Sequence, residues 1–436
     1  MARTCSILRW RAGCFRIEAV SINRFVHRSR RLPGTRHCRK VPGRMKPVAT
    51  RMARIAPFHV MDVLARAKAI EAAGRSVIHM EIGEPDFPTA PGIVQAGIKA
   101  LETGHTHYTP ALGLPELRAA IAASYLASAR PDPGRVVVTP GASGALQLIF
   151  GVLINPGDEV LMADPGYPCN RHFVRLFGGN ARLVPVDSST EYQLTADLVR
   201  RHWSERTRAV LLASPSNPTG TVVAPTEMAK IIRTTLELGG RPIVDEIYLG
   251  LVYDGDVVSA LTHSPDVFVV NSFSKYFGMT GWRIGWLVAP AEYIPEIDRL
   301  AQNIFLATNT PAQHAALAAF DPAVDIELRH RREIFRERRD YLLPALRRLG
   351  FDIPLVPQGA FYLYADCSRF THDAHAFALK LLEEAAVAIT PGLDFGEHQP
   401  ERHVRFSYAN TLENLAEGVR RIASHLGVNP RLADSD

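Results

Sequence analysis

Short apolar runs that alternate with helix-compatible stretches constrain the fold of this chain more than any other feature. From residue 52 onward, the runs at 136–139, 159–162, 209–213, 242–244, 267–270 and 285–288 have the composition of short buried strands. Between several of them lie stretches compatible with helices, at 143–153, 169–177 and 226–238. Apolar strands that alternate with helices are typical of a mostly parallel sheet with helices on both faces. The sequence therefore predicts an α/β fold.

The remainder of the chain predicts a smaller α+β domain. Residues 309–348 have a long, charged helical pattern that ends at Gly350. Beyond it, strand-like runs at 361–364 and 403–406 alternate with helical patterns at 374–384 and 412–426. We therefore expect a large domain over 91–312, a small domain over 313–427 and a short tail over 428–436. The segment 53–90 is expected to pack with the small domain.

Residues 1–51 form a basic leader that we exclude from the fold. They contain twelve Arg and two Lys against one acid, Glu18, so they carry +13, and the rest of the chain carries −7 of the net +6. The leader lacks helical periodicity, and we expect it to be disordered or absent from the mature protein. Three interpretations remain open: a transit-like presequence, a basic tail for an acidic surface, or a start codon assigned too far upstream of Met45 or Met52.

Composition argues against several other classes of protein. No apolar run approaches the roughly 20 residues of a membrane span, and no Lys/Arg run after residue 51 suggests a nucleic-acid surface. Three of the five Cys lie in the leader, and Cys169 and Cys367 stand alone, so we expect no bound metal and a reducing compartment. We expect a cytoplasmic protein, with organellar import as the alternative if the leader is a transit segment.

Lys275 follows one of the strand-like runs and has the neighbours of a phosphate site. Ser272 and Ser274 precede it, and Arg283 follows eight residues later. A lysine held at a strand end supplies an amine for a Schiff base, and Ser and Arg beside it receive a phosphate dianion. This pattern points to pyridoxal phosphate, although the run alone also fits a surface lysine in a Gly-rich loop.

Other chemically informative residues also follow strand-like runs. Gly141, Tyr167, Asn217 and Asp245 each come within a few residues of a strand end, as Lys275 does. Ligands of parallel sheets bind beyond the carboxyl ends of the strands, so these residues should meet at one edge. The small residues Gly141, Ala142 and Ser143 open a helix there, where backbone N–H groups can approach a phosphate.

Eight motifs in order extend the pattern along the chain. They are IGEPD at 82–86, YTPALGLPELR at 108–118, TPGAS at 139–143, DPGYP at 164–168, SPSNPTG at 214–220, DEIY at 245–248, SFSKYFGMTGWR at 272–283 and HVRFSY at 403–408. From about residue 53 to 427, the chain resembles the class I/II aminotransferases, the fold type I pyridoxal phosphate enzymes. The resemblance implies a large, mostly parallel sheet domain with helices on both faces, plus a smaller α+β domain.

The resemblance also assigns roles in cofactor binding. Lys275 would be the catalytic residue and form the Schiff base with pyridoxal 5′-phosphate. Asp245, a carboxylate that is costly to bury unless it is paired, would bind the pyridine nitrogen. The remaining cofactor residues would be Gly141, Ala142, Ser143, Ser272, Ser274 and Arg283 at the phosphate, Asn217 and Tyr248 at the ring hydroxyl, and Tyr167 stacked on the ring.

Substrate and partner contacts follow from the same resemblance. Arg405, alone in an apolar strand-like run, would hold the substrate α-carboxylate, with Gly83 and Asn217 beside it; a structural ion pair is the alternative. Tyr108 would reach the phosphate of a partner subunit, which implies a homodimer with shared sites. Ser143 occupies a position where one subgroup of aspartate aminotransferases has a Lys for a second carboxylate. Acidic side chains are therefore not obviously favoured, and the aromatic residues around Tyr167, Phe361 and Tyr362 leave room for an apolar or aromatic amino acid.

The expected activity is transfer of an amino group from an α-amino acid to a 2-oxo acid by a ping-pong Schiff-base mechanism. A C–S β-lyase on the same scaffold remains an alternative because it would share every residue named above. A regulator with an aminotransferase-like domain is a further alternative. It would need a DNA-binding head of about 60 residues, and the leader has no helical apolar periodicity.

Overall fold

The computed structural model describes residues 48–255 and 258–428. Most of the predicted leader and all but the first residue of the predicted tail lie outside them. The last residues of the leader belong to a short 3₁₀ helix, η1 (Thr50–Arg54), where Arg51 donates to the Leu176 carbonyl and Arg54 to the Asn180 amide oxygen. No helix of the described residues is long and apolar enough to cross a membrane.

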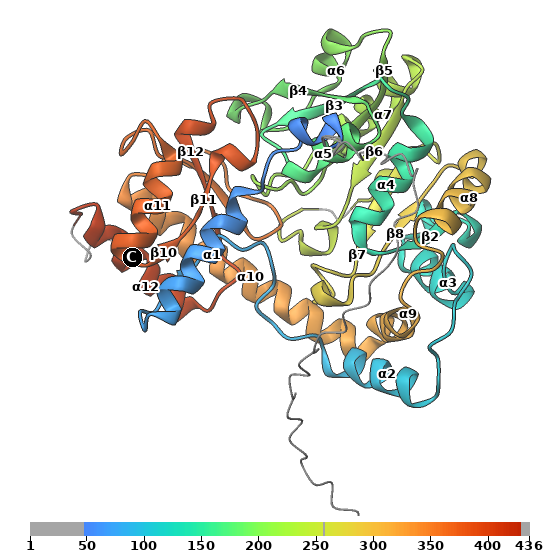
Figure 1. The fold of residues 1–436 in the computed structure, drawn as a ribbon, viewed down its shortest axis with the longest axis horizontal. Helices are drawn as coiled ribbons and strands as arrows, with labels where there is room; N and C mark the ends of the chain where they lie inside the picture. Colours follow the sequence, from blue (N-terminus) through green and yellow to red (C-terminus); the bar gives the residue numbers. More distant parts are fainter. Residues whose placement is uncertain (1–47, 256–257, 429–436) are drawn as a thin grey trace, which may run out of the picture. The chain divides into compact units, whose positions relative to one another are not determined.

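A seven-stranded sheet forms the larger part of the fold (Figure 1). Its order is β2 (Val136–Thr139), β8 (Gly285–Val288), β7 (Phe268–Ser272), β6 (Arg241–Asp245), β5 (Thr207–Ala213), β3 (Glu159–Asp164) and β4 (Asn180–Pro185). The pairs from β7 through β4 are parallel, whereas β8 runs antiparallel to both β7 and β2. The predicted mostly parallel sheet is confirmed.

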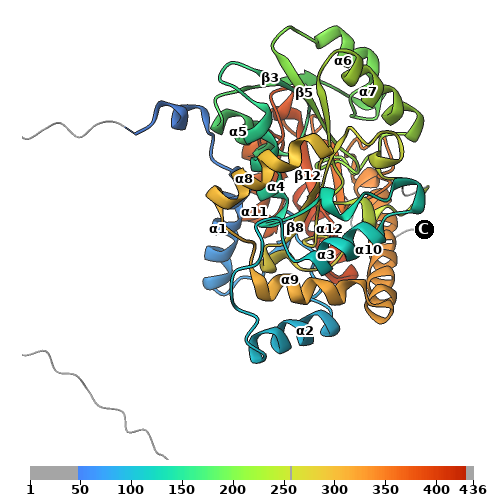
Figure 2. The ribbon, with the colours of Figure 1, turned by 90° about the vertical axis from the view of Figure 1, so that its right-hand side faces the viewer.

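Helices cover both faces of this sheet, because alternate residues of its strands point to opposite sides. Val136 and Val138 pack in one apolar cluster with α3 (Pro115–Ser124), α7 (Pro225–Glu237) and α9 (Thr310–Leu317). Val137 packs in another with α4 (Gly141–Leu153), α5 (Pro168–Leu176) and α8 (Ile294–Ile304). Figure 2 shows these two helix layers on either side of the strands. Two further helices, α2 (Pro91–Glu102) and α6 (Ala196–His202), pack on α9 and α7.

Prolines fix where many of these helices begin. Each of α2, α3, α5, α7 and α10 (Pro322–Leu349) has proline as its first residue, where the missing N–H costs nothing. Pro322 also divides the predicted helical region over 309–348 into α9, a short 3₁₀ turn and α10. The long helix ends at Gly350, whose φ of 104° is the left-handed conformation that glycine adopts without strain.

The C-terminal part has its own sheets and its own apolar cluster. An antiparallel sheet has the order β11 (Thr390–Pro391), β12 (His403–Ser407), β9 (Tyr362–Asp366), and β1 (Ile78–His79) pairs in parallel with β10 (Val387–Ala388). Around them pack α10, α11 (Ala374–Ala385) and α12 (Leu412–His425). The N-terminal helix α1 (His59–Ala72) contacts α11, β10 and β11. The division into two domains near residue 312 stays a prediction.

The reversed strand β8 places a tight backbone contact at the edge where the parallel strands end. Its first residue, Gly285, pairs with both Ser272 of β7 and Thr139 of β2. A Cβ atom on Gly285 would lie 2.8 Å from the Asn271 carbonyl oxygen and 2.9 Å from the Ala142 nitrogen. Because all of these neighbours are backbone atoms, only glycine fits here.

We predict that Gly285→Ala lowers the free energy of unfolding by about 1–3 kcal/mol, the usual cost of overpacking a close contact. The control is Gly281→Ala, four residues earlier, where no atom lies within 4 Å of the added Cβ. Urea unfolding of both variants and the parent chain measures the difference. Equal stability of the two variants would contradict a backbone constraint at β8.

Candidate functional site

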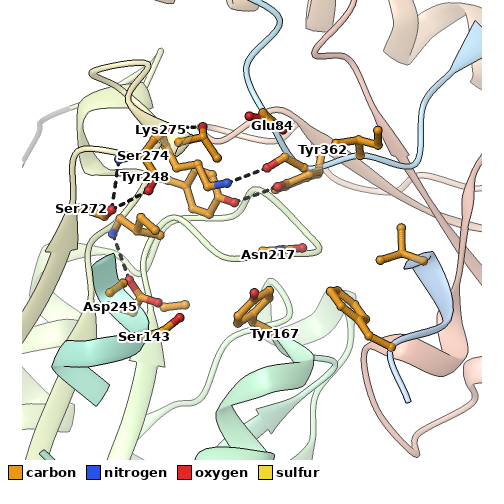
Figure 3. A pocket seen from close by; sticks show the side chains of 18 of the residues that line it. Glu84, Ser143, Tyr167, Asn217, Asp245, Tyr248, Ser272, Ser274, Lys275 and Tyr362 are labelled. Atoms are coloured by element: carbon orange, nitrogen blue, oxygen red, sulfur yellow. Dashed lines mark hydrogen bonds between the residues drawn. The ribbon is translucent and has the colours of Figure 1, made fainter. Parts of the chain in front are cut away.

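A cavity of about 270 Å³ lies at the carboxyl edge of the large sheet (Figure 3). Strands β2, β3, β5, β6 and β7 end at this edge, and the antiparallel β8 begins there. The predicted site residues that line the cavity are Gly83, Ala142, Ser143, Tyr167, Asn217, Asp245, Tyr248, Ser272, Ser274, Lys275, Arg283 and Arg405. Residues separated by more than 300 positions therefore meet in one place.

One end of the cavity is lined by hydrogen-bond donors. Helix α4 begins at Gly141 without a side-chain cap, so its first N–H groups lack an intrahelical or capping acceptor. Gly141 has a φ of 68°, and a Cβ on it would lie 2.7 Å from an Arg283 guanidinium nitrogen. Ser272 Oγ lies 2.9 Å from Ser274 Oγ. Together they form a cradle for an anion.

Lys275 lies in the cavity and not on an exposed loop surface. Its Nζ donates to the Gly83 carbonyl at 2.6 Å. Burial lowers the pKa of Lys275 to about 8, with Arg405 and Arg283 adding to the fall and Glu84 opposing it. Near neutral pH, a much larger share of this amine is therefore unprotonated than of a free lysine. The alternative of a solvated surface lysine is wrong.

Asp245 ends strand β6 and is buried on the cavity floor. One carboxylate oxygen accepts the Ile247 N–H at 3.0 Å. Burial raises the pKa of Asp245 to about 6, although the Ile247 N–H and Lys275 both favour the ionised form. A cationic ligand group beside this carboxyl group would offset the free-energy cost of its desolvation and favour its ionised form.

Tyr248 and Asn217 face the cavity from two different segments. The Tyr248 hydroxyl lies 2.8 Å from the Tyr362 hydroxyl, and burial holds the pKa of Tyr248 well above its usual range. Asn217 is buried in the segment after β5, and its amide oxygen accepts from Arg405 at 2.9 Å. This leaves the Asn217 amide nitrogen free to donate toward the cavity.

Arg405 is a buried cation without a carboxylate partner among residues 48–255 and 258–428. Its guanidinium donates to Asn217, to the Glu81 carbonyl at 2.5 Å and to Thr390 Oγ1 at 3.2 Å. Its buried Nε has no hydrogen-bond partner. The alternative of a structural ion pair is therefore wrong for Arg405, and the site fits an incoming anion.

Six apolar residues form a wall along part of the cavity. It consists of Phe58, Val60, Met61 and Leu64 at the start of α1, with Ile82 and Phe173. Met61 is 57% exposed, so part of its side chain is open to solvent where the wall borders the cavity. The wall could therefore cover the apolar part of a bound ligand.

Asp394 fixes the start of α1 and thereby the position of the wall. Its two carboxylate oxygens accept the backbone N–H groups of His59 and Val60, each at 2.8 Å. Asp394 is almost fully buried, and burial raises its pKa. Because Phe58 offers no side-chain cap to α1, this carboxylate replaces one.

Two predicted residues do not line the cavity. Gly141 precedes Ala142, which lines the cavity, and its lack of a Cβ lets the Arg283 guanidinium come close to the start of α4. Tyr108 lies between α2 and α3 and is 83% exposed, so none of the residues that the structure describes buries it. Its predicted contact with a partner subunit stays a prediction.

The sequence did not assign roles to several residues that shape the site. These are Tyr362 beside Tyr248, Glu81 and Thr390 around Arg405, Asp394, and the α1 residues of the wall. Apolar residues at helical spacing near residue 60 were a usable signal for the wall, since 58, 61 and 64 share one helix face. The others act through contacts between distant segments, which no local pattern contains.

Comparisons with known proteins agree with this geometry. The family model described as Aminotransferase class I and II matches residues 75–422. A valine–pyruvate aminotransferase of Mycobacterium tuberculosis is 39% identical over 376 residues, which cover 85% of this chain and 97% of that protein. A (5-formylfuran-3-yl)methyl phosphate transaminase of Methanocaldococcus jannaschii is 38% identical over 384 residues, covering 87% and 99%. A solved structure of an aminotransferase from Mycobacterium tuberculosis matches with a TM-score of 0.85 at 39% identity, covering 88% and 99%.

Asp245→Asn should stabilise the protein measured without added cofactor. The folded-state pKa of about 6 lies above the ordinary 3.8, so ionisation of Asp245 destabilises the fold as the pH rises from about 4 to 6. Asn cannot ionise, and the gain at pH 7 should reach about 3 kcal/mol and vanish near pH 4. Urea unfolding at both pH values measures it. A loss of stability at pH 7 would show that neighbouring groups stabilise the ionised carboxylate.

Proposed function

The chain belongs to the class I and II aminotransferases, and on this premise we propose that its cavity binds pyridoxal phosphate and the amino acid that reacts there. The protein is an aminotransferase that acts on amino acids and 2-oxo acids. When bound, pyridoxal phosphate supplies an aldehyde for the amino group and a protonated ring that accepts electrons from the substrate Cα. The observation that carries the proposal is Lys275, an amine of lowered pKa at the centre of the donor set.

The residues at the start of α4 fit the phosphate. Uncapped N–H groups at a helix start favour an anion, and the absence of a Cβ on Gly141 leaves room for Arg283. Ser272 and Ser274 would donate from the other side of the same cradle. Arg283 would hold the dianion through a planar fork of donors.

The middle of the cavity fits the ring. Asp245 would bind the protonated ring nitrogen, and that ion pair would offset the desolvation that raises its pKa. Tyr167 would stack on the ring face, while Tyr248 and Asn217 would donate to the ring hydroxyl oxygen. Each of these side chains already faces the cavity.

Lys275 would act twice. Its unprotonated amine would hold the cofactor through the aldehyde, and with substrate bound its Nζ would take and return the proton of the substrate Cα. A pKa of about 8 suits both duties, because the amine accepts and releases a proton near neutral pH. Arg405 would hold the α-carboxylate, with the Gly83 backbone beside it, and so direct Cα toward Lys275.

The apolar wall supports a substrate with an uncharged, apolar side chain. Among the described residues that line the cavity, the cations are Lys275, Arg283 and Arg405, and each has a role above. No further cation of the described lining remains for a second carboxylate. The two relatives are named for different substrates.

We also propose a homodimer with shared sites. Tyr108 is too exposed to serve its own subunit, and an exposed tyrosine between two helices could reach the phosphate of a second copy. A cytoplasmic location stays a prediction, because the segment that would carry a targeting signal lies outside the described residues.

The function is tested by mixing the protein and pyridoxal phosphate with leucine, phenylalanine and aspartate in turn, and identifying the products. We expect conversion of the bound cofactor to its amine form and release of 2-oxo acids, fastest with the apolar substrates. Lys275→Ala should lower the rate of amino-group transfer by about 10²–10⁴-fold or more, since it removes the acid–base group. Activity of that variant within tenfold of the parent would refute the assignment. Release of ammonia and a thiol from a cysteine conjugate would instead identify a β-lyase.

Arg405→Lys should raise KM for all three amino acids alike. Lysine keeps the charge but loses the planar fork, and one lost charge-assisted hydrogen bond costs about 1.5–3 kcal/mol, or roughly 10–150-fold in affinity. The α-carboxylate is common to every substrate, so the effect should not depend on the side chain. Steady-state kinetics measures it. A rise confined to one amino acid would show that Arg405 reads a side chain.

A further inference from the structure

Tyr362 contacts both Tyr248 and Arg405, two residues with different roles in the proposed site. It is the first residue of β9, fully buried, and lines the cavity. Its hydroxyl lies 2.8 Å from the Tyr248 hydroxyl (Figure 3). A Cβ on Gly83 would lie 2.3 Å from the same oxygen, so the glycine makes room for this hydroxyl. The carbonyl of Gly83 is also the acceptor for Lys275.

The Arg405 guanidinium lies over the ring of Tyr362. The Arg405 guanidinium carbon lies 4.3 Å from the centre of the Tyr362 ring and 5.0 Å from that of Phe395. Strand register explains the contact: Arg405 pairs with Tyr364, and Tyr362 pairs with Ser407 two residues further on. Tyr362 is thus the diagonal neighbour of Arg405 on the same face of the sheet.

The direction of the bond between the two hydroxyls determines what Tyr248 can do. A tyrosine hydroxyl has a single proton, so Tyr248 can donate into the cavity only if Tyr362 donates to it. Burial raises the pKa of Tyr362, and the Arg405 guanidinium over its ring opposes that rise, so the hydroxyl is a better donor than it would be without Arg405. Accepting that bond in turn polarises the Tyr248 hydroxyl and strengthens its own donation.

We propose that Tyr362 is a positioning residue that donates its hydroxyl hydrogen bond to Tyr248 and holds the Arg405 guanidinium over the face of its ring. One side chain thereby sets both the ring-hydroxyl donor and the carboxylate anchor. The inference rests on the roles proposed above for Tyr248 and Arg405. The hydroxyl and the ring of Tyr362 have different roles, and two substitutions test them one at a time.

Tyr362→Phe removes the hydroxyl and keeps the ring. In the holoenzyme, the pH at which the absorbance of the bound cofactor changes should move upward by about 0.3–1 unit, because Tyr248 becomes a weaker donor to the ring oxygen. The affinity for 4-methylpentanoate, a carboxylate probe without an amino group, should stay within about twofold. An unchanged absorbance titration would overturn the hydroxyl's part in the proposal.

Tyr362→Leu removes the ring as well. It should weaken binding of 4-methylpentanoate by about 2- to 30-fold, the range expected for loss of a partly desolvated cation–π contact. Unchanged affinity would overturn the ring's part. Thermal unfolding of both holoenzyme variants checks that each is folded under the assay conditions.

Two further variants distinguish this link from a general loss of packing. Tyr125→Phe also removes a buried hydroxyl, one that accepts from Trp286 Nε1 at 2.9 Å outside the cavity, and should leave the titration unchanged. In a Tyr248→Phe background, Tyr362→Phe should cause no further shift, because its effect passes through Tyr248. A full shift in that background would overturn the proposal.

The absorbance measurement also separates this inference from the proposed function. If the parent chain takes up no pyridoxal phosphate, the proposed function fails. If it binds the cofactor and transaminates but Tyr362→Phe titrates like the parent, the inference alone fails.

Discussion

The backbone contact at Gly285 is the constraint on which the site depends. Strand β8 runs against its neighbours, so it starts at the edge where the parallel strands finish. Its first residue touches backbone at both Asn271 and the start of α4. Arg283, two residues earlier, therefore lies beside the start of α4. A parallel strand in this place would have carried Arg283 to the opposite edge.

The surroundings of Arg405 follow a different principle, in which a buried charge is held by neutral groups. Arg405 contacts two aromatic rings, has no carboxylate partner among the described residues, and has a buried Nε with no hydrogen-bond partner. Burying such a group is unfavourable in the free protein. Neutral partners such as the Glu81 carbonyl and Thr390 hold its orientation without neutralising it. The energy recovered when a carboxylate arrives can then contribute to binding.

Sequence patterns predicted the parallel strands and the meeting of several polar residues at one edge of the sheet, because both follow from local rules. Apolar runs mark buried strands, and the edge rule then gathers Asp245 and Lys275. Strand β4 was not predicted, because Asn180–Pro185 is mostly half-buried and mixes polar with apolar residues. The reversal of β8 has no local signature.

The links around Tyr362 could not be predicted, for reasons of chain distance. Tyr248 and Tyr362 are 114 residues apart, and Arg405 and Asn217 are 188 apart. A motif records which residue types are present, whereas these contacts depend on how two sheets are placed against each other. Arg405 itself was predictable, because a lone cation in an apolar strand is conspicuous, but its partners were not.

Met61 is the exposed member of the apolar wall, and this separates contact with a ligand from packing of the core. It lines the cavity yet is 57% exposed, so replacing it should cost the fold little. Substitutions at Met61 can then change the size and polarity of the wall without disturbing Lys275, Asp245 or the sheet beneath them. Divergence of substrate preference among proteins of one fold requires no compensating change in the core.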